Sequence, residues 1–114
     1  MNDDISLYIP AYNAEKTIEK SIESILQQTL KPKEIIVIND CSTDKTPHLL
    51  KNFHEIKIIN NKMNYGLAKS RNIALKNSKY DFLASIDSDV ACEKDWLEIL
   101  FKTMVEKNID LIGG

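Results

Sequence analysis

The sequence predicts an α/β fold in which a mostly parallel sheet carries helices on both faces. Short β-branched runs alternate along the chain with segments of helical periodicity. Two of these runs, residues 34–38 and 82–86, are almost wholly apolar, as parallel strands covered on both faces are. Strands and helices in alternation build right-handed βαβ units, and these units build a doubly wound sheet.

Five β-branched runs are predicted as strands: residues 5–9, 34–38, 56–60, 82–86 and 109–112. A first helix is predicted between the first two strands. One of its faces is apolar, and its charged residues lie on the others. The apolar face is formed by Ala14, Ile18, Ile22, Ile25 and Leu26.

Three further helices are predicted. The second is short, is capped by Asp44 or Thr43, and has Pro47 in its first turn. The third follows Gly66 and covers about residues 67–77. The fourth has an apolar stripe of Leu97, Leu100, Phe101 and Met104.

Composition excludes several classes of protein. The 114 residues, 43% hydrophobic and 28% charged, fit one globular domain. The formal net charge of −2, with Lys and Arg scattered among acids, argues against a nucleic-acid binder. The first residues lack the basic region of a signal peptide, and no apolar run comes near the ~18 residues of a membrane span, so we expect a cytoplasmic protein without a signal peptide. Cys41 and Cys92 are expected to be free thiols.

Polar side chains follow three of the predicted strands, at the points where these strands end. Ligands of open α/β sheets bind outside the carboxyl ends of the strands, so these segments form the candidate site. They are Pro10-Ala11-Tyr12-Asn13, Asn39-Asp40-Cys41-Ser42 and Asp87-Ser88-Asp89.

Asp87 and Asp89 are the strongest signal in the chain. Two carboxylates one residue apart repel each other, and a divalent cation relieves that repulsion. Oxygen ligands suit Mg²⁺ or Mn²⁺, which keep open positions for substrate phosphates. The alternative is a solvated loop in which an aspartate caps the following helix, because such triplets often arise by chance.

Three other residues have a structural alternative beside a nucleotide-binding role. Asp40 either accepts hydrogen bonds from a ribose hydroxyl or a base N–H, or caps the turn that follows it. Tyr12 offers an aromatic face to a base, or is a half-buried core tyrosine. Asn13 is either part of the nucleotide site or the N-cap of the first helix.

Arg71 is a further candidate, because it lies four residues from both Leu67 and Leu75 in the predicted apolar stripe of its helix. A guanidinium there either reaches solvent or pairs with an anion. The strand-end acids and a ligand diphosphate are the two anions that we consider.

Five segments together resemble the family-two glycosyltransferases. They are residues 9–13 (IPAYN), 25–29 (ILQQT), 34–44 (EIIVINDCSTD), 64–72 (NYGLAKSRN) and 87–89 (DSD). They occur in that family's order and spacing, and the likeness covers nearly the whole chain. Five ordered motifs are far more specific than any one of them.

The resemblance implies a Rossmann-like half of a GT-A fold that binds a nucleoside-diphosphate sugar, usually UDP-linked, with Mn²⁺ or Mg²⁺. It implies uridine contacts for Pro10, Tyr12 and Asp40. It implies that Asp87 faces the ribose or sugar beside the metal, and that Asp89 coordinates the metal.

The resemblance also implies a reaction. The metal stabilises the leaving diphosphate as a Lewis acid, and a carboxylate base deprotonates an acceptor hydroxyl. The sugar then passes with inversion to a saccharide or lipid-linked acceptor, in the synthesis of cell-surface polysaccharides. The parent protein is expected in the cytoplasm, at the inner face of the membrane.

Three residues depart from the family's pattern. Asn39 replaces one carboxylate of an acidic pair, Cys41 stands where glycine is usual, and Val90 follows where a further aspartate is common. None of these changes removes Asp40 or Asp89, so nucleotide binding is expected to survive. The alternative is a non-catalytic nucleotide-binding module whose site has decayed.

We expect residues 1–114 to be the N-terminal donor-binding part of a longer glycosyltransferase domain. The family's catalytic base and acceptor site lie beyond Gly114, so the chain should bind donor without turnover. Ile109, Leu111 and Ile112 would then form a strand that nothing covers. Such apolar surfaces drive association, so the sequence predicts self-association of the fragment.

Overall fold

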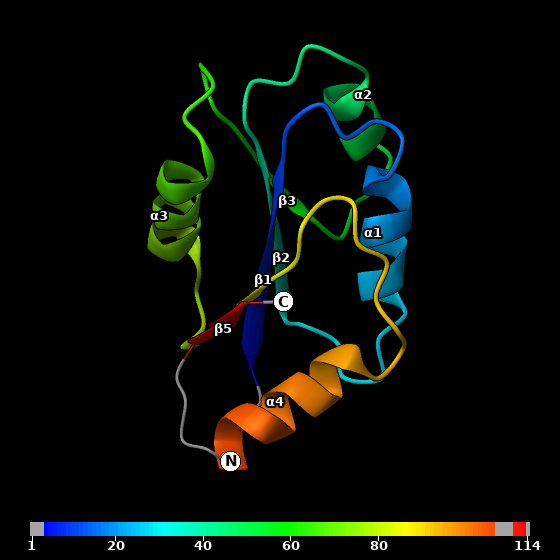
Figure 1. Ribbon diagram of the computed structural model, residues 1–114, viewed down its shortest axis with the longest axis vertical. Coiled ribbons are helices and arrows are strands. Elements are labelled where there is room, and N and C mark those ends of the chain that lie inside the picture. Colours follow the sequence, from blue (N-terminus) through cyan, green and yellow to red (C-terminus); the bar gives the residue numbers. More distant parts are fainter. Residues whose placement is uncertain (1–3, 107–110, 114) are drawn as a thin grey trace.

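The computed structural model describes residues 4–106 and 111–113, and it has a five-stranded parallel sheet with strand order β3-β2-β1-β4-β5 (Figure 1). The strands are β1 (Ile5–Ala11), β2 (Glu34–Asn39), β3 (Lys57–Asn60), β4 (Phe82–Ser85) and β5 (Leu111–Gly113). The helices are α1 (Ile18–Leu26), α2 (Thr46–Leu50), α3 (Leu67–Asn77) and α4 (Trp96–Glu106). The predicted α/β fold is confirmed.

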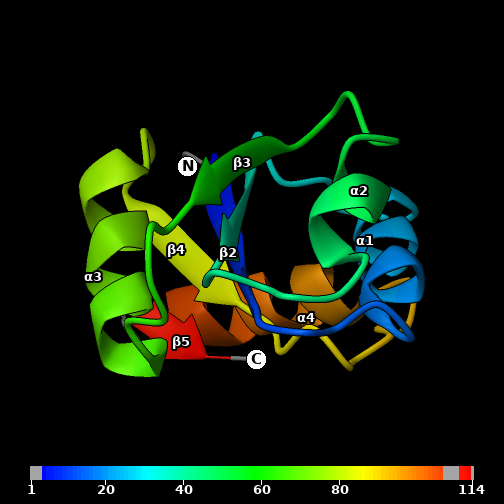
Figure 2. The ribbon, with the colours of Figure 1, turned by 90° about the horizontal axis from the view of Figure 1, so that it is seen from above.

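Helices cover both faces of the sheet (Figure 2). Helices α1, α2 and α4 pack on one face, and the predicted apolar stripes of the first and last helices are confirmed. Their buried residues include Ile18, Ile22, Ile25, Leu97, Phe101 and Met104. Helix α3 covers the other face, where Ala74 packs in a cluster with Tyr8, Ile36, Ile38 and Leu83.

The order of the strands places a candidate site at the end of β1. The chain builds β1, β2 and β3 outward in one direction, and then crosses to β4 and β5 on the other side of β1. The strand order therefore reverses between β1 and β4. Open α/β sheets bind ligands at such a switch point.

Helix α3 faces the sheet differently from the prediction. The expected apolar stripe of Leu67, Arg71 and Leu75 is wrong, since Leu67 is 73% exposed and Leu75 is 43% exposed. The buried residues of α3 are Ser70 and Ala74. Their small side chains allow the helix to pack on the sheet. Arg71 is exposed, so its guanidinium reaches solvent.

The starts of the first two helices also differ in part from the prediction. The N-cap of α1 is Thr17, not Asn13. The N-cap of α2 is Lys45, and Pro47 lies in the first turn as predicted. Asp44 still contributes at this helix start, because its Oδ1 accepts a hydrogen bond from the N–H of Thr46 at 2.9 Å.

The predicted last strand is present as β5, which pairs in parallel with β4 at one edge of the sheet. Ile109 and the side chains of Leu111 and Ile112 lie outside the part of the chain that the structure describes. The predicted apolar patch and the self-association of the fragment therefore stay predictions.

Both cysteines lie within the described part of the chain. Cys41 and Cys92 are both free thiols. Within residues 4–106 and 111–113, no helix combines the length and the apolar character that a membrane crossing requires.

Candidate functional site

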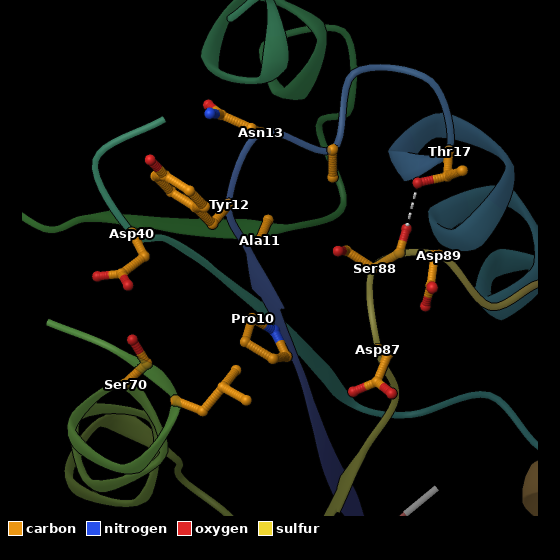
Figure 3. A pocket seen from close by; sticks show the side chains of 12 residues that line it. Pro10, Ala11, Tyr12, Asn13, Thr17, Asp40, Ser70, Asp87, Ser88 and Asp89 are labelled. Atoms are coloured by element: carbon orange, nitrogen blue, oxygen red, sulfur yellow. Dashed lines mark hydrogen bonds between the residues drawn. The ribbon is translucent and has the colours of Figure 1, made fainter. Parts of the chain in front are cut away.

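A cavity of about 430 Å³ opens at the switch point between β1 and β4 (Figure 3). This volume is in the range of small-molecule sites. The cavity is lined by Pro10, Ala11, Tyr12, Asn13, Ala14, Thr17, Asp40, Leu67, Ser70, Asp87, Ser88 and Asp89. These residues come from the ends of β1, β2 and β4 and from the starts of α1 and α3. We call this space the switch-point cavity.

The switch-point cavity brings together every predicted site residue except Arg71. Arg71 lies on the exposed face of α3, next in sequence to Ser70, which does line the cavity. A contact between Arg71 and a ligand stays a prediction.

Tyr12 and Pro10 form the part of the cavity that follows β1. Half of the surface of Tyr12 is exposed, 50%, so the alternative of a core tyrosine is wrong. Figure 3 shows Pro10 between Asp40 on one side and Asp87 on the other. An exposed aromatic ring at the rim of a cavity is available for stacking on a flat ligand.

Asn13 joins the loop after β1 to the loop after β2. Its φ of 49° is in the left-handed region, which asparagine tolerates better than most residues. Its Oδ1 accepts a hydrogen bond from the N–H of Thr43 at 2.7 Å, and its own N–H donates to Ser42 Oγ at 3.0 Å. The predicted capping role is thus replaced by a bridge between two strand ends.

Asp40 is buried, 6% exposed, and its carboxylate has three donors. Oδ1 accepts hydrogen bonds from Asn61 Nδ2 and from the N–H of Tyr65, both at 2.8 Å, and Oδ2 accepts one from the N–H of Gly66 at 2.9 Å. Burial raises the pKa of Asp40, but these hydrogen bonds to the ionised form outweigh burial and hold the pKa below its ordinary value. Asp40 is therefore an anion that ties the end of β2 to the start of α3.

The residues beside Asp40 explain two of the departures from the family pattern. Asn39 Oδ1 accepts from the N–H of Ser42 at 3.1 Å, which is the turn-capping role considered for Asp40. Asn39 Nδ2 donates to Asn60 Oδ1 at 2.9 Å, a bond that an aspartate at position 39 could not donate. Cys41 has a φ of 62°, the left-handed conformation that glycine adopts without strain, so this position is one that favours glycine.

Asp87 and Asp89 line the cavity, and both are exposed. Among the described residues, no hydrogen bond or ion pair engages either side-chain carboxylate, so neither caps α4. The described part of the chain also contains no group of three or more His, Cys, Asp or Glu that could hold a metal ion. Mg²⁺ is usually held by one or two carboxylates together with substrate phosphates and water. Asp87 and Asp89 therefore fit a cation whose coordination a diphosphate completes, and they do not form a closed metal cage.

Thr17 and Ser70 line the cavity but were not identified from the sequence, whereas Ser88 belongs to a segment that was. Thr17 Oγ1 and Ser21 Oγ both donate to the carbonyl oxygen of Ser88, each at 2.9 Å. One signal was available, because polar residues recur at helical spacing beside the apolar stripe of α1. These residues are Thr17, Ser21, Ser24 and Gln28.

Two curated proteins are similar to this chain over nearly all of its length. It is 37% identical to Glycosyltransferase GlyA of Streptococcus pneumoniae, over 100% of the chain and 17% of that protein. It is 38% identical to the UDP-Glc:alpha-D-GlcNAc-diphosphoundecaprenol beta-1,3-glucosyltransferase WfgD of Escherichia coli, over 96% of the chain and 44% of that protein. The chain thus spans less than half the length of these relatives.

Solved structures of a further protein have the same fold. The structure of S. aureus TarS 1-349 in complex with UDP has a TM-score of 0.80 and 31% identity, over 92% of this chain and 33% of that one. Its complex with UDP-GlcNAc has a TM-score of 0.81, over 92% of this chain and 32% of that one.

Residues 6–114 also match the protein family described as Glycosyl transferase family 2. This match begins in β1 and includes every residue that lines the switch-point cavity. Because it runs from Ser6 to the last residue of the sequence, the chain belongs to glycosyl transferase family 2.

Proposed function

We propose that this chain is the donor-binding part of a glycosyltransferase and that the switch-point cavity holds the nucleotide of a UDP-sugar. The observation that carries the proposal is the placement of Tyr12, Asp40, Asp87 and Asp89 around one cavity at a switch point. UDP and UDP-GlcNAc are the ligands of the similar TarS structures, and WfgD is named for a UDP-Glc donor, which supports UDP as the nucleotide.

The residues near β1 and β2 would recognise the uridine. Tyr12 presents an exposed ring for stacking on the base, with Pro10 beside it. Asp40 is ionised at neutral pH, because its pKa is lowered, and an ionised carboxylate only accepts hydrogen bonds. Its Oδ2 has one donor, the N–H of Gly66, and so has a lone pair for a ribose hydroxyl or a base N–H.

Asp87 and Asp89 would hold Mn²⁺ or Mg²⁺ together with the diphosphate. Their carboxylates lack other partners within the described residues, so no protein group competes for them. When bound, the cation supplies Lewis-acid stabilisation of the negative charge on the leaving diphosphate. The chain itself would keep the two carboxylates at the cavity, on the side away from Asp40 (Figure 3).

The whole protein would transfer the sugar, with inversion, to an acceptor hydroxyl on a saccharide or lipid-linked carrier. WfgD is named for a diphosphoundecaprenol-linked acceptor, which supports a lipid-linked carrier and a site at the inner face of the membrane. The chain spans less than half the length of the similar proteins, and we propose that this part binds donor without turnover.

Isothermal titration of the chain with UDP tests this proposal. We expect binding in EDTA and tighter binding in Mn²⁺, because the cation joins the diphosphate to Asp89. Asp89→Asn should lose the gain that Mn²⁺ gives. Asp95→Asn is its matched control, since Asp95 is an exposed carboxylate that does not line the cavity. Equal affinity in Mn²⁺ and in EDTA would contradict the metal role. A complete lack of UDP binding would contradict the nucleotide role and favour a module whose site has decayed.

A further inference from the structure

Helix α1 holds the residue that separates the two carboxylates of the site. The carbonyl oxygen of Ser88 accepts one hydrogen bond from Thr17 Oγ1 and another from Ser21 Oγ, both at 2.9 Å. Figure 3 shows the first of these bonds. A carbonyl oxygen has two lone pairs, so the two hydroxyls together use both of them.

Neither hydroxyl makes the bond that is usual for its position in a helix. Thr17 is the N-cap of α1, where a threonine oxygen normally accepts a hydrogen bond from the first turn of its own helix. Thr17 makes no such side-chain bond. Ser21 lies inside the helix, where a serine commonly bonds the carbonyl four residues before it, yet its hydroxyl donates to Ser88. Both residues thus bind a distant segment instead of their own helix.

The same face of α1 binds the rest of the segment between β4 and α4. Ser24 Oγ accepts from the N–H of Cys92 at 3.0 Å. Gln28 Nε2 donates to the carbonyl of Glu93 at 2.6 Å, and Gln28 Oε1 accepts from the N–H of Leu97 at 2.9 Å. Residues 90–93 have no regular secondary structure, and Figure 1 shows the segment running along α1. Side chains of α1, together with Gln28 just beyond its end, therefore supply the anchors that a strand or helix would otherwise supply.

The carboxylates of Asp87 and Asp89 depend on this anchoring. Within the described residues nothing binds either carboxylate directly, so their position follows from the backbone of residues 87–89. The peptide between Ser88 and Asp89 carries the carbonyl that α1 holds. A change in its orientation would alter the spacing of the two carboxylates, while both would stay exposed at the cavity.

We propose that Thr17 and Ser21 are positioning residues for the Asp87–Asp89 pair, acting through the carbonyl of Ser88. The inference rests on the proposed function, because it assigns a purpose to the cation-binding pair. Partners that orient metal ligands typically change metal affinity about ten- to a hundred-fold when they are removed. The effect should fall on the metal-dependent part of UDP binding and leave the metal-independent part in place.

The test uses Thr17→Val and Ser21→Ala, singly and together. Valine keeps the shape of threonine and removes only the hydroxyl. The matched controls are Thr103→Val and Ser78→Ala, whose hydroxyls also donate to backbone carbonyls, at 2.9 and 3.0 Å, but do not line the cavity. Thr17→Ser keeps a hydroxyl and serves as the rescue variant. Each protein is titrated with UDP in Mn²⁺ and in EDTA, and amide hydrogen exchange of residues 87–93 is measured without ligand.

Mn²⁺ raises the UDP affinity of the unaltered chain by some factor, and we expect this factor to be about ten-fold or more smaller in the double variant. Exchange at residues 87–93 should become faster in the double variant. The affinity of Ser21→Ala in EDTA should stay within about two-fold of the unaltered chain, because Ser21 does not line the cavity. Thr17→Ser and both controls should behave as the unaltered chain does. A double variant that keeps the full Mn²⁺ gain would overturn the inference, and so would an equal loss in the two controls.

The unaltered chain is measured first, so that failure of the proposed function is seen separately. If it binds UDP equally in Mn²⁺ and in EDTA, the metal part of the proposed function is wrong and this inference is wrong with it. If Mn²⁺ raises the UDP affinity of the unaltered chain and of the double variant equally, the proposed function stands and only the positioning role of Thr17 and Ser21 is wrong.

Discussion

The carboxylate of Asp40 accepts a hydrogen bond at 2.9 Å from the backbone N–H of Gly66, a residue 26 positions later in the chain. Gly66 is the N-cap of α3, so a buried anion at the end of β2 meets the positive end of a helix. Two further bonds, from Asn61 and Tyr65, hold the same segment. Leu67 and Ser70 follow that segment and line the cavity, so Asp40 shapes the cavity as well as facing it.

Asp40→Asn and Asp89→Asn should distinguish the carboxylate that binds the nucleotide from the carboxylate that binds the metal. Asp40→Asn should weaken UDP binding in Mn²⁺ and in EDTA, about ten- to a hundred-fold, because a charge-assisted hydrogen bond to the nucleotide is lost. Asp89→Asn should remove mainly the gain that Mn²⁺ gives. Titration of both variants with UDP in the two buffers measures the difference. If both variants lose UDP affinity by the same factor in Mn²⁺ and by the same factor in EDTA, the two carboxylates do not have separate roles.

Asp40 should also make the stability of the protein depend on pH. Its folded pKa is lowered, so its stabilising effect is present above the unfolded pKa and is lost as pH falls through the folded pKa. Asp40→Asn should destabilise the fold at neutral pH by about 1–3 kcal/mol, because the amide cannot satisfy the same donors. This difference should shrink below about pH 4.

Urea denaturation of both proteins between neutral pH and about pH 3 gives the free energies of unfolding for this comparison. Asp44 and Glu98, whose pKa values are also lowered, are present in both proteins, so their effects cancel in the difference. A difference that stays constant over the whole range would contradict the role assigned to the Asp40 anion.

Gln28→Leu should be strongly destabilising. Gln28 is 2% exposed, and its amide binds the N–H of Leu97 and the carbonyl of Glu93. Leucine would leave both backbone groups without these partners, which we expect to cost about 2–4 kcal/mol in the free energy of unfolding. Gln27→Leu is the matched control, because Gln27 is exposed and should change stability by less than about 0.5 kcal/mol. Similar values for the two variants would mean that Gln28 is not an anchor.

Cys41→Gly and Cys41→Val should have different effects on stability. The φ of Cys41 is 62°, a conformation that is strained for residues with a side chain and worst for β-branched ones. Glycine should leave stability unchanged or raise it by up to about 1 kcal/mol, whereas valine should lower it. Thermal unfolding of both variants measures this. Valine tolerated as well as glycine would argue against a left-handed turn after β2.

Much of the fold and the site followed from local patterns. The apolar runs of β1, β2 and β4 each end in polar residues, and parallel strands bring their carboxyl ends to one edge of the sheet. Tyr12, Asp40 and Asp89 could therefore be placed at one site from the sequence. The apolar stripe of α1 was equally clear, because isoleucines recur at helical spacing.

Contacts between distant segments could not be predicted in the same way. The partners of Thr17 and Ser21 lie 71 and 67 residues away, so no local pattern contains them. The predicted orientation of α3 was wrong, because it placed the most apolar residues, Leu67 and Leu75, on the buried face in preference to Ser70 and Ala74. Packing against the sheet selected the small residues instead, and the leucines lie on the exposed face.

NMR mapping of UDP binding shows residue by residue whether the switch-point cavity is the UDP site. Backbone amide shifts of the ¹⁵N-labelled chain are followed as UDP is added in Mg²⁺, which does not broaden signals as Mn²⁺ does. The largest shift changes are expected at residues 11–13, 40–42 and 87–89, with smaller ones around Gly66. A second cavity, of about 320 Å³, is lined by Lys31, Lys33 and Glu55 and offers a direct comparison within the same protein. Shift changes centred on that cavity, with residues 87–89 unaffected, would show that UDP does not bind at the switch-point cavity.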